Sequence, residues 1–162
     1  MKVLAFLLAA LAAASANDAI LAELGLIPFN GGQYLLSSFN ASWVDASNFC
    51  KSIGFALVDI DTEEDHVTVT DVFGAAIPDR VWIGGTDLGR EGSFYWGQSL
   101  RDFSPNETYW HEGEPSGTSL HGIKEDCVQY RRLVNDTEVL WNDAPCELKY
   151  QFICEVVPAP CA

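Results

Sequence analysis

Side chains that carry oxygen gather in the second half of the chain, with almost no nitrogen or sulfur ligand beside them. They occur in three segments: Glu114-Pro115-Ser116, Glu125-Asp126 and Asn142-Asp143. Calcium accepts about six to eight oxygen ligands in a flexible shell, whereas zinc prefers nitrogen and sulfur in a tetrahedron. The residue types therefore predict a calcium site. The alternative is a solvated acidic loop, because carboxylates beside prolines and glycines are ordinary on protein surfaces.

A framework of strands and helices must bring these separated segments together, and the first half of the chain predicts a strand and then a helix. Residues 33–39 have the composition of a strand. Apolar side chains then recur at the spacing of one helical face, at Trp43, Ala46, Cys50 and Ile53. Ser42 suits the N-cap of this helix, and Gly54 suits its end.

A second helix is predicted after a short apolar strand at residues 55–60. Asp61 and, three residues later, Glu64 predict a capping box at its start. The helical pattern runs to about residue 73, just before Gly74. We expect the two helices to flank the strands.

The second half predicts short strands on either side of a long loop. Strand-like runs occupy residues 81–85, 93–96, 127–130, 139–141 and 151–157. Residues 97–124 show no periodicity, and a loop of this length is usually either functional or disordered. Tyr109 and Trp110 argue against disorder. We therefore expect the site in this loop.

The charge of the chain excludes one class of partner. The sequence has 23 acidic and 9 basic residues and a formal net charge of −14. Such a surface repels phosphate backbones and anionic membrane surfaces. Nucleic acid is not an expected partner.

Residues 1–16 predict a secretory signal peptide. Lys2 precedes an apolar run that ends in Ala14-Ser15-Ala16, where cleavage is expected. The run is shorter than the roughly 20 residues that cross a bilayer, and no second run follows it. We expect a secreted, extracellular protein with no membrane span.

Its five cysteines would then lie in an oxidising compartment, where four can pair and one is left over.

The order of these motifs resembles the C-type lectin family. The resemblance rests on Glu114-Pro115-Ser116, Glu125-Asp126-Cys127 and Trp141-Asn142-Asp143, followed by Cys146 and Cys154. It covers nearly the whole chain after the signal peptide, and the short secreted single-domain lectins of arthropods are the most similar form. It implies an α+β, C-type lectin-like fold, in which two helices flank two small antiparallel sheets beside a long loop region that binds calcium and sugar. The lectin domain would span 33–157, after a lead segment at 17–32.

The resemblance also implies how the cysteines pair. Cys50 would bond to Cys154, and Cys127 to Cys146, although the sequence alone allows other pairings. Cys161 lies in the tail at 158–162, outside this framework. We therefore expect it to be unpaired and able to link two chains as a disulfide-bonded dimer, which would raise avidity for a glycan.

By the same resemblance, calcium is held by Glu114, Ser116, Glu125, Asn142 and Asp143. Two neighbouring sugar hydroxyls would complete the shell. All of these residues except Asp143 would also hydrogen-bond the sugar. The family pattern makes Pro115 cis. Glu114, rather than a glutamine, indicates mannose-type sugars with equatorial vicinal hydroxyls.

Two features depart from the family pattern. Ser116 stands where an asparagine is expected, and a hydroxyl cannot both ligate through a carbonyl and donate through a separate nitrogen. The interval from Glu114 to Glu125 is also longer than usual, so that inserted residues such as Leu120 and His121 could reshape the rim of the sugar site.

An auxiliary calcium site would use Asp87, Glu91, Glu125 and Asp126. Gly117 stands where this site would have a further aspartate. The alternative role for Asp87 and Glu91 is turn chemistry between two strands.

The predicted function is calcium-dependent carbohydrate binding, without catalysis, in glycan or pathogen recognition within innate immunity. The alternative is a lectin-like protein ligand or inhibitor in which the calcium site is degraded or structural.

Three tryptophans beside strands are expected in the core: Trp82, Trp96 and Trp141. The three histidines are expected on the surface. Three N-glycosylation sequons are present, at Asn40, Asn106 and Asn135.

Overall fold

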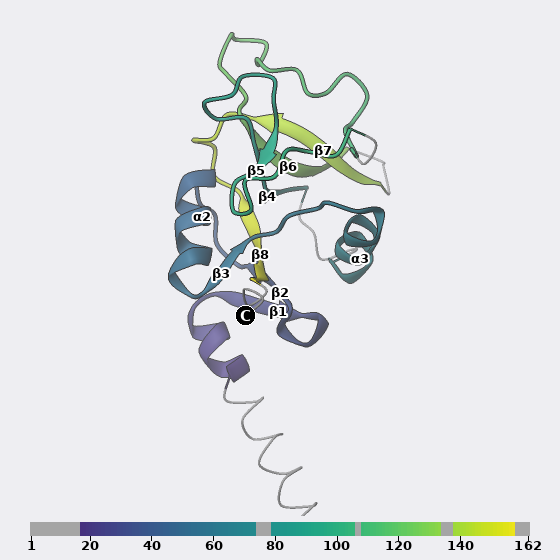
Figure 1. Ribbon diagram of the computed structural model, residues 1–162. Helices are drawn as coiled ribbons and strands as arrows, with labels where there is room; N and C mark the ends of the chain where they lie inside the picture. Colours follow the sequence, from purple (N-terminus) through teal and green to yellow (C-terminus); the bar gives the residue numbers. More distant parts are fainter. Residues whose placement is uncertain (1–16, 74–78, 106–107, 134–137, 158–162) are drawn as a thin grey trace, which may run out of the picture.

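The computed structural model describes residues 17–73, 79–105, 108–133 and 138–157. The predicted signal peptide, Cys161 and the sequon asparagines Asn106 and Asn135 lie outside the described residues. Figure 1 shows two groups of strands stacked along the molecule, with the long loops extending beyond the second group. Both ends of the described chain lie near the first group.

The first helix, α2 (Trp43–Ser52), follows the predicted pattern. Ser42 caps it, because its hydroxyl accepts a hydrogen bond of 3.1 Å from the backbone N–H of Asp45. The helix buries Ala46 and Cys50, and Gly54 follows with a positive φ of 81°. These predictions are confirmed.

The second helix, α3 (Glu63–Phe73), begins with a capping box one residue later than predicted. The Thr62 hydroxyl accepts from the Asp65 backbone N–H at 3.1 Å, and the Asp65 carboxylate accepts from the Thr62 backbone N–H at 3.0 Å. The prediction that Asp61 and Glu64 form the box is wrong. Asp61 turns instead toward Arg101, which leaves Thr62 to cap the helix.

The first group of strands is built around the last strand of the chain. Its members are β1 (Leu26–Phe29), β2 (Tyr34–Ser37), β3 (Phe55–Leu57) and β8 (Gln151–Val156). All pairings within it are antiparallel, and β8 lies between β2 and β3. The strand β1 belongs to the segment 17–32, and a short 3₁₀ helix, η1 (Asn30–Gly32), joins it to β2. Leu26 of β1 is buried, so this lead segment contributes to the core.

The second group positions the long loops. Its strands are β4 (Arg80–Thr86), β5 (Tyr95–Trp96), β6 (Cys127–Arg132) and β7 (Val139–Ala144). They are antiparallel to one another, and a parallel pairing of β4 with β8 joins the two groups. The predicted α+β fold is therefore confirmed, with α2 and α3 beside two antiparallel groups of strands. The lead segment adds a further helical stretch at residues 17–23.

The core confirms the prediction for the three tryptophans, because Trp82, Trp96 and Trp141 are at most 1% exposed. The indole N–H of Trp82 donates to the carbonyl of Ala41 at 3.0 Å, which satisfies its polar atom. Such rings bury large apolar areas and contribute strongly to the stability of a core.

Two disulfides join the elements as predicted. Cys50 of α2 bonds to Cys154 of β8, with their Cα atoms 5.7 Å apart. Cys127 of β6 bonds to Cys146 just after β7, with a Cα separation of 5.2 Å. The second bond lies directly beside the loops that carry the acidic motifs.

Within the described ranges, no helix has the length and apolar character needed to cross a membrane.

Candidate functional site

An open cleft of about 700 Å³ lies between the second group of strands and the loop that precedes β6. Four predicted sugar and calcium residues line it: Glu114, Ser116, Glu125 and Asn142. Glu114, Ser116 and Glu125 come from the loop, whereas Asn142 comes from β7. The structure therefore brings together segments that the sequence separates by more than two dozen positions.

Asp143 lies behind the cleft and holds the loop to β7. It is fully buried, and its two carboxylate oxygens accept from the backbone N–H groups of Ser116 at 3.0 Å and Gly117 at 2.7 Å. The Glu114-Pro115 peptide bond is cis, as predicted. The Asp143 contacts fix the loop at the position where the side chains of Glu114 and Ser116 enter the cleft.

Glu114 is half-buried, and one of its carboxylate oxygens, Oε2, is buried without a hydrogen-bond partner among the described residues. Burial and the neighbouring Asp143 carboxylate raise the pKa of Glu114 to about 7. Two carboxylates held this close, one with an orphaned oxygen, favour a cation between them. The oxygen-only donor set around them fits calcium rather than zinc.

Ser116 and Glu125 contact one another directly. The Ser116 hydroxyl donates a hydrogen bond of 2.7 Å to Glu125 Oε2. The shorter side chain at position 116 thus turns toward another oxygen of the same cleft. Glu125 keeps a second carboxylate oxygen that can serve as a ligand.

Arg131 of β6 is a residue of this cleft that the sequence analysis missed. Its guanidinium donates a hydrogen bond of 2.8 Å to Asn142 Oδ1. The amide nitrogen of Asn142 donates to the backbone carbonyl of Asp143. No motif in the sequence marks this residue. Its place follows from the strand register, because Gln129 is paired with Asn142 and side chains two residues apart on a strand share a face.

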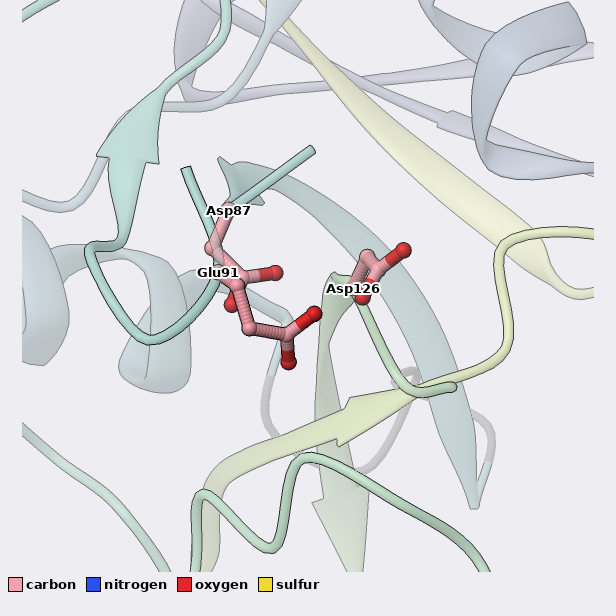
Figure 2. Close-up of side chains that lie close together, drawn as sticks. All are labelled: Asp87, Glu91 and Asp126. Atoms are coloured by element: carbon pink, nitrogen blue, oxygen red, sulfur yellow. The ribbon is translucent and has the colours of Figure 1, made fainter. Parts of the chain in front are cut away.

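The structure also brings together three of the four residues that were predicted for the auxiliary calcium site. The carboxylates of Asp87, Glu91 and Asp126 place oxygen atoms within 4.8 Å of one another. Figure 2 shows the three side chains close together. Asp87 accepts from the Gly92 backbone N–H at 2.7 Å, whereas its other oxygen is buried without a partner in the described part of the chain. Burial raises the pKa of Asp87. These three carboxylates therefore form a second candidate cation site.

Two neighbours limit this second site. Lys124 forms an ion pair with Glu91, so that a protein cation already lies at its edge. A Cβ atom added at Gly117 would lie 3.9 Å from Glu91 Oε1, which places the position of the expected further aspartate beside the cluster. Glu125, which was also expected here, contacts Ser116 in the main cleft instead and is not among the grouped carboxylates.

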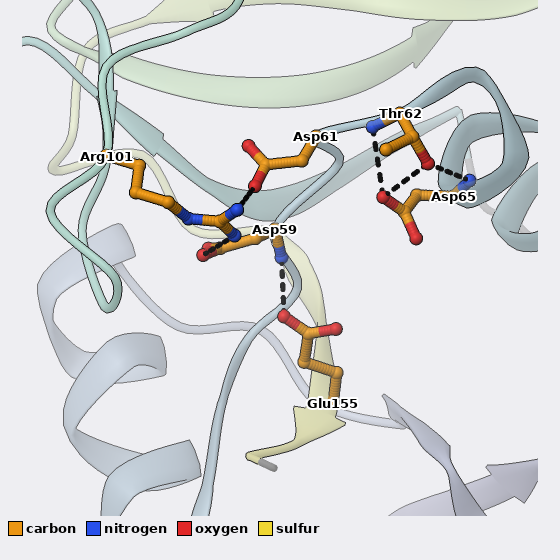
Figure 3. A network of polar contacts seen from close by, with 6 residues as sticks. All are labelled: Asp59, Asp61, Thr62, Asp65, Arg101 and Glu155. Atoms are coloured by element: carbon orange, nitrogen blue, oxygen red, sulfur yellow. Dashed lines mark hydrogen bonds and ion pairs between the residues drawn. The ribbon is translucent and has the colours of Figure 1, made fainter. Parts of the chain in front are cut away.

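A third polar cluster lies near the start of α3 and joins β8 to the segment after β3 (Figure 3). Arg101 contacts Asp61 and lies 3.9 Å from Asp59, and Glu155 accepts from the Asp59 backbone N–H at 2.8 Å. Burial raises the pKa of Glu155 to about 8 and that of Asp59 to about 6. This buried acidic network is separate from the cleft.

The histidine prediction is wrong for two of the three residues. His66 is half-buried and stacks on Tyr109 with ring centroids 3.9 Å apart. His111 is 8% exposed and contacts the Arg131 carbonyl at 2.8 Å. Both residues brace the base of the long loop. Only His121 lies on the surface, at the rim of the cleft.

Comparison with known proteins agrees with this arrangement. The family described as Lectin C-type domain matches residues 39–156. The C-type lectin mosGCTL-7 of Aedes aegypti is 32% identical over 134 residues, which cover 76% of this chain and 82% of that protein. This chain therefore belongs to the C-type lectin domain family, whose members bind ligands and do not catalyse reactions.

Solved structures show the same fold. The human scavenger receptor C-type lectin carbohydrate-recognition domain has a TM-score of 0.62 and 28% identity, covering 81% of this chain and 95% of that one. The cow CD23 C-type carbohydrate-recognition domain, solved in the presence of a GlcNAc2Man3 oligosaccharide, has a TM-score of 0.61 and 26% identity, covering 85% and 95%. The chain is thus a C-type lectin carbohydrate-recognition domain in its fold.

Proposed function

We propose that this protein is a secreted, calcium-dependent lectin that binds mannose-type glycans through the cleft at Glu114. The observation that carries the proposal is the convergence of Glu114, Ser116, Glu125 and Asn142 on one cleft, with the Asp143 carboxylate directly behind them.

Each residue has a distinct task in this proposal. Glu114, Glu125 and Asp143 supply negative charge, while Ser116 and the Asn142 amide supply neutral oxygen. When bound, calcium would accept two neighbouring sugar hydroxyls as further ligands. Asp143 has a second task, since its contacts with the Ser116 and Gly117 backbone hold the loop in place. The unpaired oxygen of Glu114 remains available for the ion.

The mannose preference rests on Glu114, which by family resemblance selects equatorial vicinal hydroxyls. The cow CD23 domain, which shares the fold, was solved in the presence of an oligosaccharide that contains mannose. This likeness supports the choice of mannose as the first sugar to test. We extend the proposal to a role in glycan or pathogen recognition of the kind served by short secreted arthropod lectins.

Secretion and modification form a second part of the proposal. Residues 1–16 act as a signal peptide, the lectin domain extends over 33–157, and Cys161 links two chains. Of the sequon asparagines, Asn40 lies on the described surface and is exposed. A single intact-mass measurement of the secreted protein, before and after reduction and glycosidase treatment, checks the cleavage site, the Cys161 link and the sequon glycans.

A rival function is supported by two contacts in the cleft. Ser116 donates to Glu125, and Arg131 donates to Asn142, so two of the expected ligand oxygens already have partners inside the protein. In a lectin-like ligand or inhibitor, the same cleft would bind protein without calcium. The two functions differ in whether a chelator abolishes binding to sugar.

The test passes the protein over immobilised mannose and immobilised galactose in calcium, then elutes with a chelator. Glu114→Gln removes one charge while keeping the side-chain shape, and Glu112→Gln makes the same change at an exposed neighbour. We expect retention on mannose, release by chelator, loss in Glu114→Gln and no loss in Glu112→Gln. If retention ignores both chelator and Glu114→Gln, or if no resin retains the protein, the proposed function is wrong.

A further inference from the structure

We infer that the cleft contains an anion subsite formed by Arg80 and Arg131, and that the preferred ligand is an acidic glycan. This inference rests on the proposed function and deepens it. The acidic group would be a carboxylate or a sulfate ester, carried by the sugar that binds at Glu114.

The two arginines are placed together by the strand register. Arg80 of β4 and Arg131 of β6 are direct Cα partners, so their side chains stand on the same face of the sheet. Both line the cleft that Glu114 and Asn142 also line. The Arg131 guanidinium is within 2.8 Å of Asn142 Oδ1, which joins this basic pair directly to the proposed sugar site.

Neither guanidinium is neutralised by a carboxylate within the described residues. Arg131 donates to the neutral amide of Asn142, and Arg80 donates to the Tyr150 hydroxyl at 2.9 Å while lying over its ring. By contrast, three other basic side chains are paired with acids: Arg90 with Asp102, Arg101 with Asp61 and Lys124 with Glu91. Lys51 and Lys149 have no ion pair within the described residues either, but they do not line the cleft, so Arg80 and Arg131 are the cations that face it in a chain of net charge −14.

Gln129 supplies an independent sign that this region binds a ligand. It lies on β6, is 1% exposed, and lines the same cleft. Its side-chain oxygen has no hydrogen-bond partner among the residues that the structure describes. A buried acceptor without a partner is costly unless a donor reaches it, and a sugar hydroxyl is such a donor. Beside it, the guanidinium groups are suited to planar recognition of carboxylate or sulfate.

The charge balance of the cleft permits an anion at this place. Three carboxylates around one calcium ion leave about one net negative charge. Arg131 and Arg80 add two positive charges on the Asn142 side of that centre. An anionic group there would meet attraction, although the remainder of the protein surface is acidic.

The test compares three soluble sugars as inhibitors of calcium-dependent binding to a mannose-coated surface: D-mannose, D-mannuronate and mannose 6-sulfate. All three share the ring hydroxyls at carbons 2, 3 and 4 and differ at carbon 6. We expect at least one acidic sugar to inhibit about tenfold better than mannose, because hydrogen bonds to a charged group are the stronger ones. Which acid inhibits better identifies the preferred group. The advantage should shrink as salt rises.

The variants Arg80→Gln and Arg131→Gln, alone and combined, should bring the ratio of acidic to neutral affinity toward one. Arg132→Gln makes the same charge change at the adjacent position, on the opposite face of β6, and should leave the ratio unchanged. Thermal melting of each variant verifies that it folds. Equal inhibition by the three sugars, or a ratio unchanged in the double variant, would overturn the inference while the lectin function stands. Absence of calcium-dependent binding to the mannose surface would overturn both.

Discussion

The Ser116 hydroxyl donates a hydrogen bond of 2.7 Å to Glu125 Oε2, so that two of the proposed calcium ligands contact one another. A serine at this position offers one oxygen for ligation and none of the separate N–H donors that an amide has. The contact with Glu125 also occupies an oxygen that would otherwise face the ion. Position 116 is therefore the weakest part of the proposed site.

Replacing Ser116 with asparagine should strengthen the site. The longer amide can place its carbonyl on calcium and its NH₂ on a sugar hydroxyl, which adds about one net hydrogen bond. We expect an increase of about fivefold in calcium-dependent mannose affinity, measured by titration calorimetry. Ser119→Asn, on the same loop, is the matched control. Equal affinity in Ser116→Asn and the unmodified protein would contradict the proposed role of this position.

Arg131 should weaken calcium binding, because its guanidinium shares Asn142 Oδ1 with the ion. Arg131→Gln removes this charge and should raise calcium affinity by about three- to tenfold at low ionic strength. Arg132→Gln controls for net charge. If both variants bind calcium equally, the hydrogen bond to Asn142 has no bearing on the metal site.

Lys124 should compete with a second calcium ion at Asp87, Glu91 and Asp126. Its ion pair with Glu91 lies at the surface, where such pairs are weak, so we expect Lys124→Gln to raise the affinity for the second ion by about two- to fivefold. Lys149→Gln is the control on an exposed lysine elsewhere. A titration that fits a single ion in the protein and in Lys124→Gln alike would show that this cluster does not bind calcium.

Much of the fold could be predicted because its signals are local or carried by motif order. The Ser42 N-cap and the apolar face of α2 lie within one stretch of sequence, and the predicted cysteine pairs are confirmed. The capping box of α3 was misplaced because Asp61 has the right residue type for a cap, yet a tertiary contact with Arg101 engages it. Whether Asp61 or Thr62 caps the helix depends on tertiary contacts, which the local sequence does not show.

The sequence predicted the oxygen ligands of the cleft but not its basic residues. The order of the motifs predicted Glu114, Glu125 and Asn142 as ligands, whereas Arg131 belongs to no motif. Its place beside Asn142 follows only from the register of β6 against β7, in which Gln129 is paired with Asn142. The lead strand β1 was missed for a similar reason, since its pairing with β2 is a tertiary contact that residues 26–29 alone do not indicate.

Glu155 should make the fold less stable at alkaline pH. Burial raises its pKa from 4.5 to about 8, with further contributions from Asp59, Asp65 and Asp61. Because the folded state holds this proton more tightly than the unfolded state does, the free energy of unfolding falls as pH rises from about 5 to about 8. Glu155→Gln keeps an acceptor for the Asp59 N–H and should flatten this slope, adding about 2 kcal/mol at pH 8.

Urea unfolding at pH 5, 6.5 and 8 with intact disulfides measures this effect. Glu147→Gln serves as the control, because Glu147 is exposed. A slope that is the same in Glu155→Gln and Glu147→Gln would show that burial of Glu155 does not govern the pH dependence.

The central claim is that Glu114 and its neighbours hold a calcium ion to which sugar binds. The most direct measurement titrates methyl α-mannoside into the protein, into Glu114→Gln and into Glu112→Gln, each with calcium and with a chelator. The claim predicts binding by the unmodified protein and Glu112→Gln in calcium alone, with a loss of at least about tenfold in Glu114→Gln. Binding that persists in the chelator, or that survives in Glu114→Gln at full affinity, would contradict it.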